Sequence, residues 1–459
     1  MSALGIWMNG RYVGEWRQVR GGRDQFSYAQ EWRSDRQARA LSLSIPLTAE
    51  GTITSTAVRN YFDNLLPDDP RIRDRLKTRF GLRSSGTFEL LEALGRDCVG
   101  AVQLMPVGIE PEGWDQIKTR PLKTREVEAL LDAVPTTTRP LLAGEPDDSR
   151  ISLAGAQEKT ALLKLGRTWH LPLGSTPTTH ILKLPLGLVG GLKLDLSHSV
   201  DNEWLCAQFL QALKFPGAKT DIGRFGAQRV LVVQRFDRRW RAIGDADPQS
   251  ANFIPPKGAW IARLPQEDFC QATGLPSQDK YQVNGGPGIK DILRILARAE
   301  HPDESQRSFV LAQFAFWLLA AIDGHAKNFS IGHRRGGAYD LTPLYDVLSA
   351  WPVIGHGANK LSAQKVKLAM GVRGGSRLHY KLSEIQPRHF HALAESVADQ
   401  SVWAAMLRMA GSIPEIVRSL ESRLPKDFAP SVWEAVSAGV KQQALRFLKA
   451  AGPTGADAG

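Results

Sequence analysis

The sequence is poor in cysteine and lacks the short motifs that mark several large enzyme classes. Its three cysteines, Cys98, Cys206 and Cys270, are far apart and form no CxxC pair, so we predict three buried thiols in a reducing compartment, with no disulfide framework or zinc site. No GxxxxGK(S/T), GxGxxG, HExxH or GxSxG pattern occurs. These absences argue against P-loop NTPases, simple Rossmann enzymes, zincins and α/β-hydrolases.

Long apolar runs are absent as well. The longest, residues 309–322, is interrupted by Gln313 and is shorter than the roughly 20 residues that span a bilayer. The first residues show no basic region followed by an apolar stretch and a small-residue cleavage site. We therefore expect no membrane association and a cytoplasmic location.

Basic residues outnumber acidic residues, which gives the chain a formal net charge of +11. Such an excess favours polyanionic partners, either nucleic acid or a phosphorylated ligand. An arginine-rich composition is equally typical of proteins from high-GC genomes, where it carries no information about partners. The chain of 459 residues is too long for one simple core, so we expect several subdomains.

Hydrophobic patterning predicts an α+β protein in which a β-rich lobe precedes an all-helical lobe. We expect a small α/β unit over residues 1–106, with strands near 5–8 and 12–16, and a connector over 107–149 with a helix near 125–134. Residues 150–262 carry strands near 160–165, 179–184 and 229–236 and a helix near 202–213. Residues 263–445 are helical apart from a strand-like patch near 338–347, and residues 446–459 are expected to be a disordered tail.

The segment 323–328, Asp-Gly-His-Ala-Lys-Asn, carries the sharpest chemical signal. Asp323 precedes Asn328 by five residues, which is the spacing of the protein kinase catalytic loop, where the Asp is the base and the Asn binds Mg²⁺. A second metal-binding carboxylate should follow, and we choose Asp346, at the end of an apolar run, over Asp340, which resembles a turn residue. The alternative is that Asp323 and Asn328 only cap the next element.

Upstream segments supply the remaining parts of a kinase site in the expected order. Small residues in the loop 151–160 would let backbone N–H groups approach phosphates, although a plain hairpin turn is a common alternative. Lys183 is a lone cation in an apolar strand, where it could pair with phosphates and with Glu203 of the next helix, or only extend from an edge strand. The strand 229–236 would be the hinge that receives adenine.

These segments closely resemble the HipA family, the serine/threonine kinase toxins of bacterial HipBA toxin–antitoxin modules. The matching stretches are residues 61–67, 95–102, 152–159, 179–185, 199–203, 235–239, 263–268, 323–328 and 345–346. Residues 107–148, 241–259 and the far C-terminus diverge. Gln234 stands at the hinge where the best-known form of the family is expected to have Glu, which is harmless if only its backbone contacts adenine.

The resemblance implies a bilobal protein kinase-like fold, akin to phosphoinositide-kinase-like enzymes, that uses ATP and Mg²⁺. It implies Asp323 as catalytic base, Asn328 and Asp346 as metal ligands, Glu203 in a supporting ion pair and Ser152 as an autophosphorylation site that silences the kinase. The implied ATP-binding residues are Leu153, Ala154, Gly155, Ala156, Gln157, Glu158, Lys183, Gln234, Arg235, Phe236, His325 and Asn328.

The resemblance also implies partners. Family members act on translation, with aminoacyl-tRNA synthetases as the known substrate class and the glutamyl enzyme foremost. Their antitoxin is HipB, a helix-turn-helix protein that binds operator DNA, and Arg377 and Lys381 of a basic run could reach DNA in such a complex. A solvated basic face explains that run equally well.

Two other functions stay open at this point. The chain could be a weakly active or inactive kinase that serves mainly as a DNA-bound co-repressor with its antitoxin. A small-molecule or lipid kinase of similar fold is a third reading. The presence of every expected catalytic position favours the active protein kinase.

Overall fold

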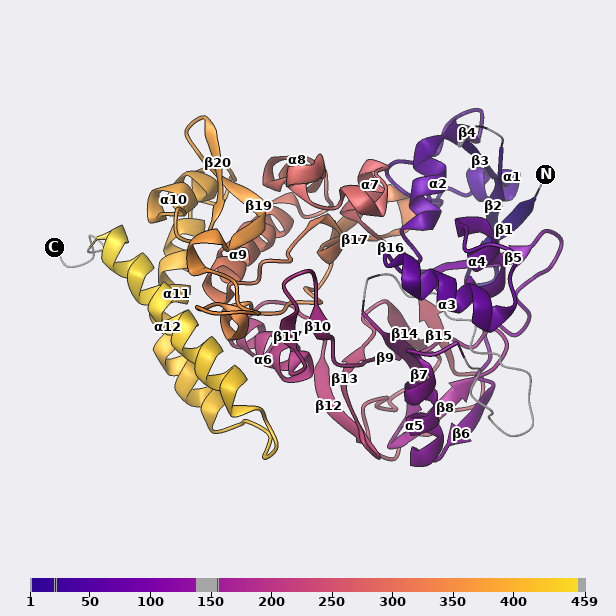
Figure 1. Cartoon of the computed structure of the whole chain (residues 1–459). Coiled ribbons are helices and arrows are strands. Elements are labelled where there is room, and N and C mark those ends of the chain that lie inside the picture. Colours follow the sequence, from indigo (N-terminus) through magenta and orange to yellow (C-terminus); the bar gives the residue numbers. More distant parts are fainter. Residues whose placement is uncertain (1, 20, 22, 138–154, 156, 453–459) are drawn as a thin grey trace. The chain divides into compact units, whose positions relative to one another are not determined.

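The computed structural model describes residues 2–19, 21, 23–137, 155 and 157–452 (Figure 1). The chain divides into two compact units. Unit 1 comprises Met1–Leu184, Lys219–Asp279 and Ser330–Tyr339. Unit 2 comprises Pro185–Ala218, Lys280–Phe329 and Asp340–Gly459. The chain passes repeatedly between the units, so neither is continuous in sequence. The mixture of sheets and helices confirms the expected α+β class.

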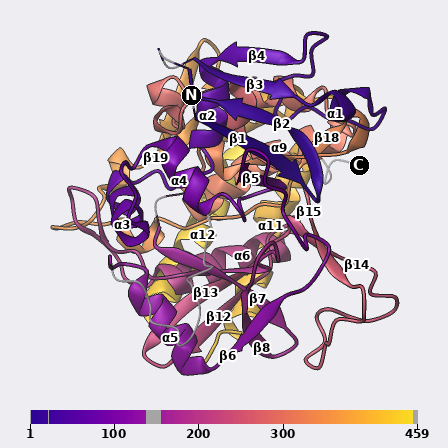
Figure 2. The same cartoon turned by 90° about the vertical axis from the view of Figure 1, so that its right-hand side faces the viewer.

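The N-terminal part of unit 1 is a five-stranded antiparallel sheet in the order β4-β3-β2-β1-β5 (Figure 2). Its strands are β1 Ala3–Met8, β2 Arg11–Arg17, β3 Asp24–Tyr28, β4 Thr52–Ser55 and β5 Val102–Pro106, and its helices are α1 Gln30–Ser34, α2 Thr56–Asp63, α3 Pro70–Phe80 and α4 Thr87–Leu94. The Asn9–Gly10 turn joins β1 and β2 with both residues at positive φ, as the pair predicts. The core includes Trp16, whose ring stacks on Phe62 with centroids 4.2 Å apart.

A second sheet in unit 1 has the order β12-β13-β9-β7-β8-β6. Its strands are β6 Thr119–Leu122, β7 Lys159–Leu165, β8 Thr168–Pro172, β9 His180–Lys183, β12 Thr220–Phe225 and β13 Gln228–Gln234. Helix α5 (Thr124–Ala133) packs on this sheet, with Val127 and Leu131 in one buried cluster with Leu162 and Leu182. Residues 119–133 of the expected connector therefore contribute a strand and a helix to this core.

Further elements complete unit 1. Strands β14 (Arg238–Arg241) and β15 (Trp260–Arg263) pair with each other, and β16 (Gln266–Asp268) pairs with β17 (Ser330–His333). Helix α7 (Phe269–Thr273) packs against the N-terminal subdomain, because the Ser44 hydroxyl donates to the Gln271 carbonyl at 2.7 Å and the Asn60 amide to the Gly274 carbonyl at 2.8 Å. Residues 263–279, which the pattern assigned to the helical lobe, thus fold with unit 1.

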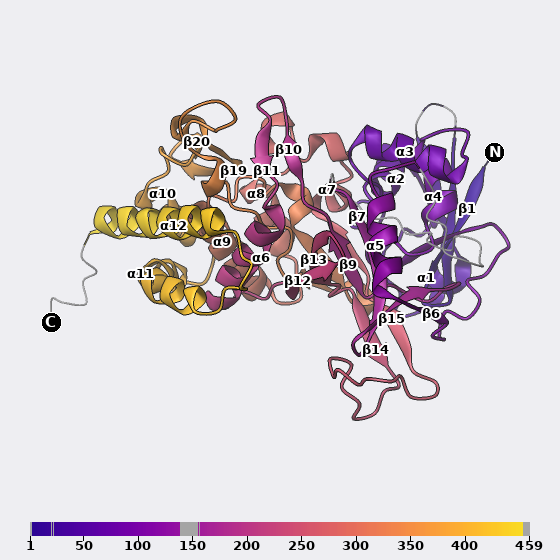
Figure 3. The same cartoon turned by 60° about the horizontal axis from the view of Figure 1, so that its bottom comes forward.

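Unit 2 is mainly helical. Its helices are α6 Ser199–Ala212, α8 Ile289–Leu296, α9 Pro302–Leu319, α10 Pro387–Glu395, α11 Val402–Glu421 and α12 Pro430–Ala451, and its short 3₁₀ turns include η2 Gln282–Asn284 and η3 Ala326–Asn328. The 3₁₀ turn η1 (Ser277–Asp279) ends the preceding segment of unit 1. Helices α11 and α12 lie side by side (Figure 3). From Phe309 to Leu319 every residue of helix α9 is buried, Phe314 and Trp317 among them. Among the described helices, none is both long and apolar enough to cross a membrane.

Two expectations for this region are wrong. Residues 263–445 are not all-helical, because β19 (Lys367–Gly374) pairs with β20 (Arg377–Lys381). Strand β19 buries five consecutive residues, Leu368–Val372, and so short an apolar run cannot be told from a buried helix by its period. The pair β10 (Gly187–Val189) and β11 (Leu194–Leu196) lies in the part of the chain that was expected to be rich in strands. The expected tail from residue 446 begins too early, because α12 continues to Ala451 with Phe447 fully buried. The three cysteines are buried, as predicted, and none of them forms a disulfide; burial raises the pKa of Cys98 to about 12.

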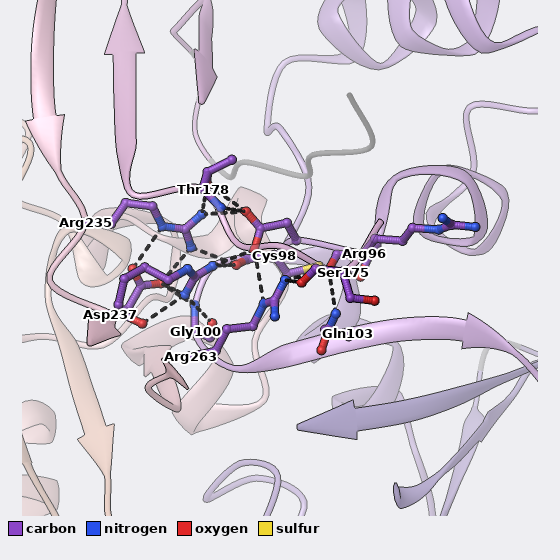
Figure 4. Close-up of polar contacts among 12 residues, drawn as sticks. Arg96, Cys98, Gly100, Gln103, Ser175, Thr178, Arg235, Asp237 and Arg263 are labelled. Atoms are coloured by element: carbon purple, nitrogen blue, oxygen red, sulfur yellow. Dashed lines mark hydrogen bonds and ion pairs between the residues drawn. The ribbon is translucent and has the colours of Figure 1, made fainter. Parts of the chain in front are cut away.

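A buried cluster of two aspartates and three arginines joins distant segments of unit 1 (Figure 4). The Asp97 carboxylate accepts from Arg238 Nη2 at 2.9 Å, Arg263 Nε at 3.2 Å and Arg235 Nη1 at 3.4 Å. Asp237 accepts from Arg235 Nη2 at 2.7 Å. The side chains of all five are at most 7% exposed, so each guanidinium depends on these carboxylates for its charge balance.

The charge states of the cluster follow from burial and from its own pairs. Burial alone raises the pKa of Asp97, but attraction to Arg238, Arg235 and Arg263 outweighs it and holds the pKa below its ordinary value. Burial lowers the pKa of Arg263 to about 10, which still leaves the guanidinium protonated at neutral pH. The cluster is therefore ionised under ordinary conditions.

We expect Asp97→Asn to destabilise the protein by about 3–5 kcal/mol, because three buried guanidinium groups then share one carboxylate. The lowered pKa of Asp97 means that its stabilisation is complete above its ordinary pKa of 3.8 and is lost as the pH falls below it. Urea unfolding should therefore show a difference in the free energy of unfolding between wild type and variant that is constant near neutrality and narrows as the pH falls below about 4. Glu15→Gln, which breaks a pair with the half-exposed Arg17, is the control and should leave the free energy of unfolding nearly unchanged. An equal effect of the two variants would contradict this account.

Candidate active site

The segment 323–328 is a compact loop that follows the end of α9. The helix stops because Ala320 takes a left-handed conformation (φ 50°) and its carbonyl accepts from the Ala350 N–H at 2.9 Å. Within the loop, the His325 N–H donates to the Asp323 carbonyl at 2.8 Å and the Asn328 N–H to the His325 carbonyl at 2.9 Å. The loop thus starts from a buried helix and is closed by its own backbone bonds.

Gly324 is required by the packing of this loop against α9. A Cβ atom at position 324 would lie 2.4 Å from Cδ2 of Phe316, far inside contact distance. Phe316 cannot easily move aside, since its ring stacks on Phe329 with centroids 5.4 Å apart in the same core. The glycine therefore lets the chain pass directly over the aromatic core that supports Asp323.

Asn328 links the two ends of the proposed metal site. Its side-chain amide nitrogen donates to the Asp323 carbonyl at 2.9 Å and to the Asp346 carbonyl at 3.4 Å. These bonds orient the amide so that Oδ1, the atom a metal would need, faces away from both carbonyls. The Tyr345 hydroxyl adds a bond of 2.9 Å to the Lys327 carbonyl. The structure thus brings Asp323, Asn328 and Asp346 together within unit 2.

The two acidic candidates for a metal ligand have different surroundings. Asp346 is a non-glycine residue at φ 60°, a conformation that costs an L-residue about 1 kcal/mol or more. Asp340 accepts from the His301 N–H at 2.8 Å and lies 3.0 Å from His301 Nδ1, at the start of α9. Asp340 therefore stabilises a helix terminus, while Asp346 takes a strained backbone beside Asn328.

Two further residues, one in the 323–328 loop and one outside it, complete the surroundings of Asp323. His325, expected to bind ATP, is buried with Nε2 3.9 Å from Asp323 Oδ1. Tyr281 donates its hydroxyl to Asp323 Oδ1 at 2.5 Å. Sequence reasoning missed Tyr281, because nothing in the local pattern connects it with a residue 42 positions further along the chain.

The expected nucleotide residues of unit 1 gather at β7, β9 and β13. Lys183 is 6% exposed and lies in register between Lys159 on one side and Leu231 on the other. It is therefore a residue of an interior strand, contrary to the edge-strand alternative. Glu203, its expected partner, is buried on α6 in unit 2. Their ion pair stays a prediction.

The described part of the small-residue loop is held by the N-terminal subdomain. Gly155 lies at φ 102° and forms a parallel bridge with Pro67, and its carbonyl accepts from the Asp68 N–H at 3.2 Å. Glu158 forms an ion pair with Arg75 of α3. Gln157 donates to the Leu184 carbonyl at 2.7 Å. Arg75 was not predicted, because it lies 83 residues before its partner. Ser152, Leu153, Ala154 and Ala156 lie outside the described residues.

The expected hinge needs one correction. The Arg235 side chain is fully engaged in the Asp97–Asp237 cluster, so its guanidinium is not available to a nucleotide. Its N–H donates to the Thr179 carbonyl at 2.9 Å, and the Gln234 N–H donates to the Lys219 carbonyl at 2.8 Å. Neither of these two N–H groups is therefore available to a nucleotide. The Phe236 ring is half-buried.

The predicted DNA-contacting residues lie on the β19–β20 hairpin. Arg377 is exposed at the tip, and Lys381 pairs with Glu384 at 2.7 Å with its side chain 41% exposed. Lys365, Lys367 and Arg373 are exposed on the same segment. The basic run is therefore a surface feature of unit 2.

A buried strand lysine, an Asp-x4-Asn loop closed over a helix and a following aspartate define a kinase-like protein. Sequence models identify its family: the HipA N-terminal domain matches residues 4–105, and the HipA-like C-terminal domain matches residues 151–424. The chain belongs to the HipA family.

Named relatives agree with this assignment. The chain is 36% identical over 353 residues to the putative kinase Y4mE of Sinorhizobium fredii, covering 75% of this chain and 77% of the relative. It is 28% identical over 335 residues to the serine/threonine-protein kinase toxin HipA of Shewanella oneidensis, covering 70% of each. The fold matches HipA in the Shewanella oneidensis complex of HipA, HipB and operator DNA, with a TM-score of 0.74, 24% identity and 97% of each chain covered.

We expect Gly324→Ala to impair catalysis more than it impairs folding. The added methyl group must displace either Phe316 or the loop, at a cost of about 1–3 kcal/mol, and a loop shift of about 1 Å can lower a reaction rate by about 100-fold. Phosphoryl-transfer rates and thermal unfolding would measure the two effects. Gly411→Ala in α11 is the matched control, since a Cβ atom there meets nothing within 4 Å; it should keep full activity and leave stability unchanged or slightly higher. Full activity of Gly324→Ala would refute the packing argument.

Proposed function

We propose that this protein is an ATP- and Mg²⁺-dependent serine/threonine protein kinase that acts as the toxin of a toxin–antitoxin pair. One observation supports it most: the Asp323–Asn328 loop and Asp346 are joined by the Asn328 side chain into one arrangement. The relative from Shewanella oneidensis, named a serine/threonine-protein kinase toxin, adds support from similarity.

The proposed chemistry assigns one role to each group. The exposed Asp323 carboxylate orients a substrate Ser or Thr hydroxyl and accepts its proton while that oxygen attacks the γ-phosphorus. Lys183, the cation of the interior strand β9, would bind phosphate oxygens. Backbone N–H groups of the small-residue loop would do the same.

The residues present fit a magnesium ion. Asn328 Oδ1 and the Asp346 carboxylate are hard oxygen donors of the kind that Mg²⁺ prefers, and the amide orientation directs Oδ1 away from the backbone. When bound, Mg²⁺ neutralises charge that develops on the phosphate oxygens.

Similarity to the family extends the proposal to targets and control. We propose an aminoacyl-tRNA synthetase, the glutamyl enzyme foremost, as the substrate, with arrest of growth and persistence as the result. Ser152 would be the autophosphorylation site, where added negative charge beside the phosphate site would expel the loop and silence the kinase. A HipB-type antitoxin would bind the protein on operator DNA and make it a co-repressor in the cytoplasm.

The co-repressor role has a supporting observation of its own. The exposed cations of the β19–β20 hairpin, Arg377 among them, would suit phosphate contacts next to a bound antitoxin. If kinase activity is weak, this role could be the main one.

We expect wild-type protein with Mg²⁺ and γ-labelled ATP to incorporate label at Ser152, identified by peptide mapping. Asp323→Gln should lower incorporation by about 100-fold or more, because a general base contributes about 10²–10⁴ to the rate. Asp340→Asn is the matched control: it removes a carboxylate bound to His301 outside the proposed site and should keep the activity, with thermal unfolding as the check on folding.

Three results would change the proposal. Absence of label in wild-type and variant proteins alike would leave only the co-repressor role. Label at another residue would refute the Ser152 assignment alone. Loss of activity in a folded Asp340→Asn would contradict Asp346 as the metal-binding aspartate.

A further inference from the structure

We propose that Tyr281 is a positioning residue for the catalytic base, a role that rests on the proposed kinase function. Tyr281 lies between the 3₁₀ turns η1 and η2, and its hydroxyl donates to Asp323 Oδ1 at 2.5 Å. Its ring meets His325 edge to face, with centroids 5.0 Å apart and planes at 87°. The phenol therefore contacts two residues of the same catalytic loop.

The backbone that carries Tyr281 is anchored on the loop and on a sheet. The Ala326 N–H donates to the Lys280 carbonyl at 3.2 Å, so the segment and the catalytic loop share a main-chain bond. The Gly371 N–H of β19 donates to Gln282 Oε1 at 2.8 Å. The Tyr281 carbonyl accepts from the Gly286 N–H at 3.0 Å. The phenol thus projects from a segment bonded on both sides.

Asp323 needs such a restraint. Its side chain is 62% exposed, and an exposed carboxylate samples several rotamers unless something holds it. A base must stay within hydrogen-bond reach of the hydroxyl it deprotonates. If the carboxylate is poorly oriented, the rate of phosphoryl transfer therefore falls. The hydroxyl of Tyr281 engages Oδ1 and leaves Oδ2 to the substrate.

The resulting step is balanced without a proton from Tyr281. Asp323 Oδ2 takes the proton of the substrate hydroxyl as its oxygen forms a bond to the γ-phosphorus of ATP. The bond from that phosphorus to the β,γ-bridging oxygen breaks, and its electron pair leaves with ADP. Tyr281 keeps its hydrogen throughout and acts only through Asp323.

We expect Tyr281→Phe, which keeps the ring packed on His325 and removes the hydroxyl, to lower kcat by about tenfold or more. KM for ATP and KM for a protein substrate should each change less than about twofold, because the phenol is assigned no contact with either substrate. Steady-state kinetics over both substrates would measure this. Tyr380→Phe is the matched control: a half-buried tyrosine of the same unit, on β20, which should keep kcat and both KM values.

The possible failures are separable. An active wild type with an unchanged kcat in Tyr281→Phe would overturn the positioning role and leave the kinase intact. A parallel change of kcat, both KM values and thermal stability would also overturn it, because that pattern marks a general structural role. A wild type that transfers no phosphate to any substrate would overturn the kinase function and, with it, this inference.

Discussion

The ionised state of Asp97 and Asp237 is the constraint on which unit 1 depends. Three guanidinium groups and two carboxylates are buried together, and each guanidinium is tolerable there only while the carboxylates are charged. The cluster also satisfies backbone groups, since Asp237 accepts from the Gly100 N–H and Arg235 donates to the Cys98 carbonyl, both at 2.8 Å. It therefore binds the end of β13 to the N-terminal subdomain. The two HipA domains that sequence models separate are joined in unit 1 by this charged core.

The candidate residues of each unit have supports within that unit. In unit 1, Lys183 depends on the interior strands β7, β9 and β13, and Gly155 and Glu158 are held by the segment 67–75 of the N-terminal subdomain. In unit 2, Asp323 and Asn328 depend on the buried end of α9 and on Gly324. The N-terminal subdomain therefore contacts the described part of the small-residue loop in addition to forming its own core.

The sequence pattern predicted the strands, helices and turns that depend mainly on neighbouring residues. The strands around residues 5–8, 160–165 and 229–236, the helix near 202–213 and the Asn9–Gly10 turn follow from side-chain period and turn chemistry, and all appear in the structure. The order of the candidate site motifs along the chain was also apparent from the sequence. Contacts between distant residues could not be predicted: Arg75 with Glu158, Tyr281 with Asp323, and Arg235 with Asp97, whose partner lies 138 residues away. The β19–β20 hairpin was missed because β19 is a continuous buried run and β20 has no buried residue, so neither strand shows the alternation that predicts a strand.

At position 346 the proposed metal binding and thermal stability favour different residues, because Asp346 has a left-handed backbone. Glycine, and to a lesser degree asparagine, adopts that conformation at lower cost, but neither carries a carboxylate. Laboratory evolution for thermostability alone would therefore favour such replacements at position 346 and enrich proteins that fold better than the natural chain and have lost an acidic oxygen beside Asn328. Position 346 is therefore a point at which the fold could gain stability while the acidic side chain is lost.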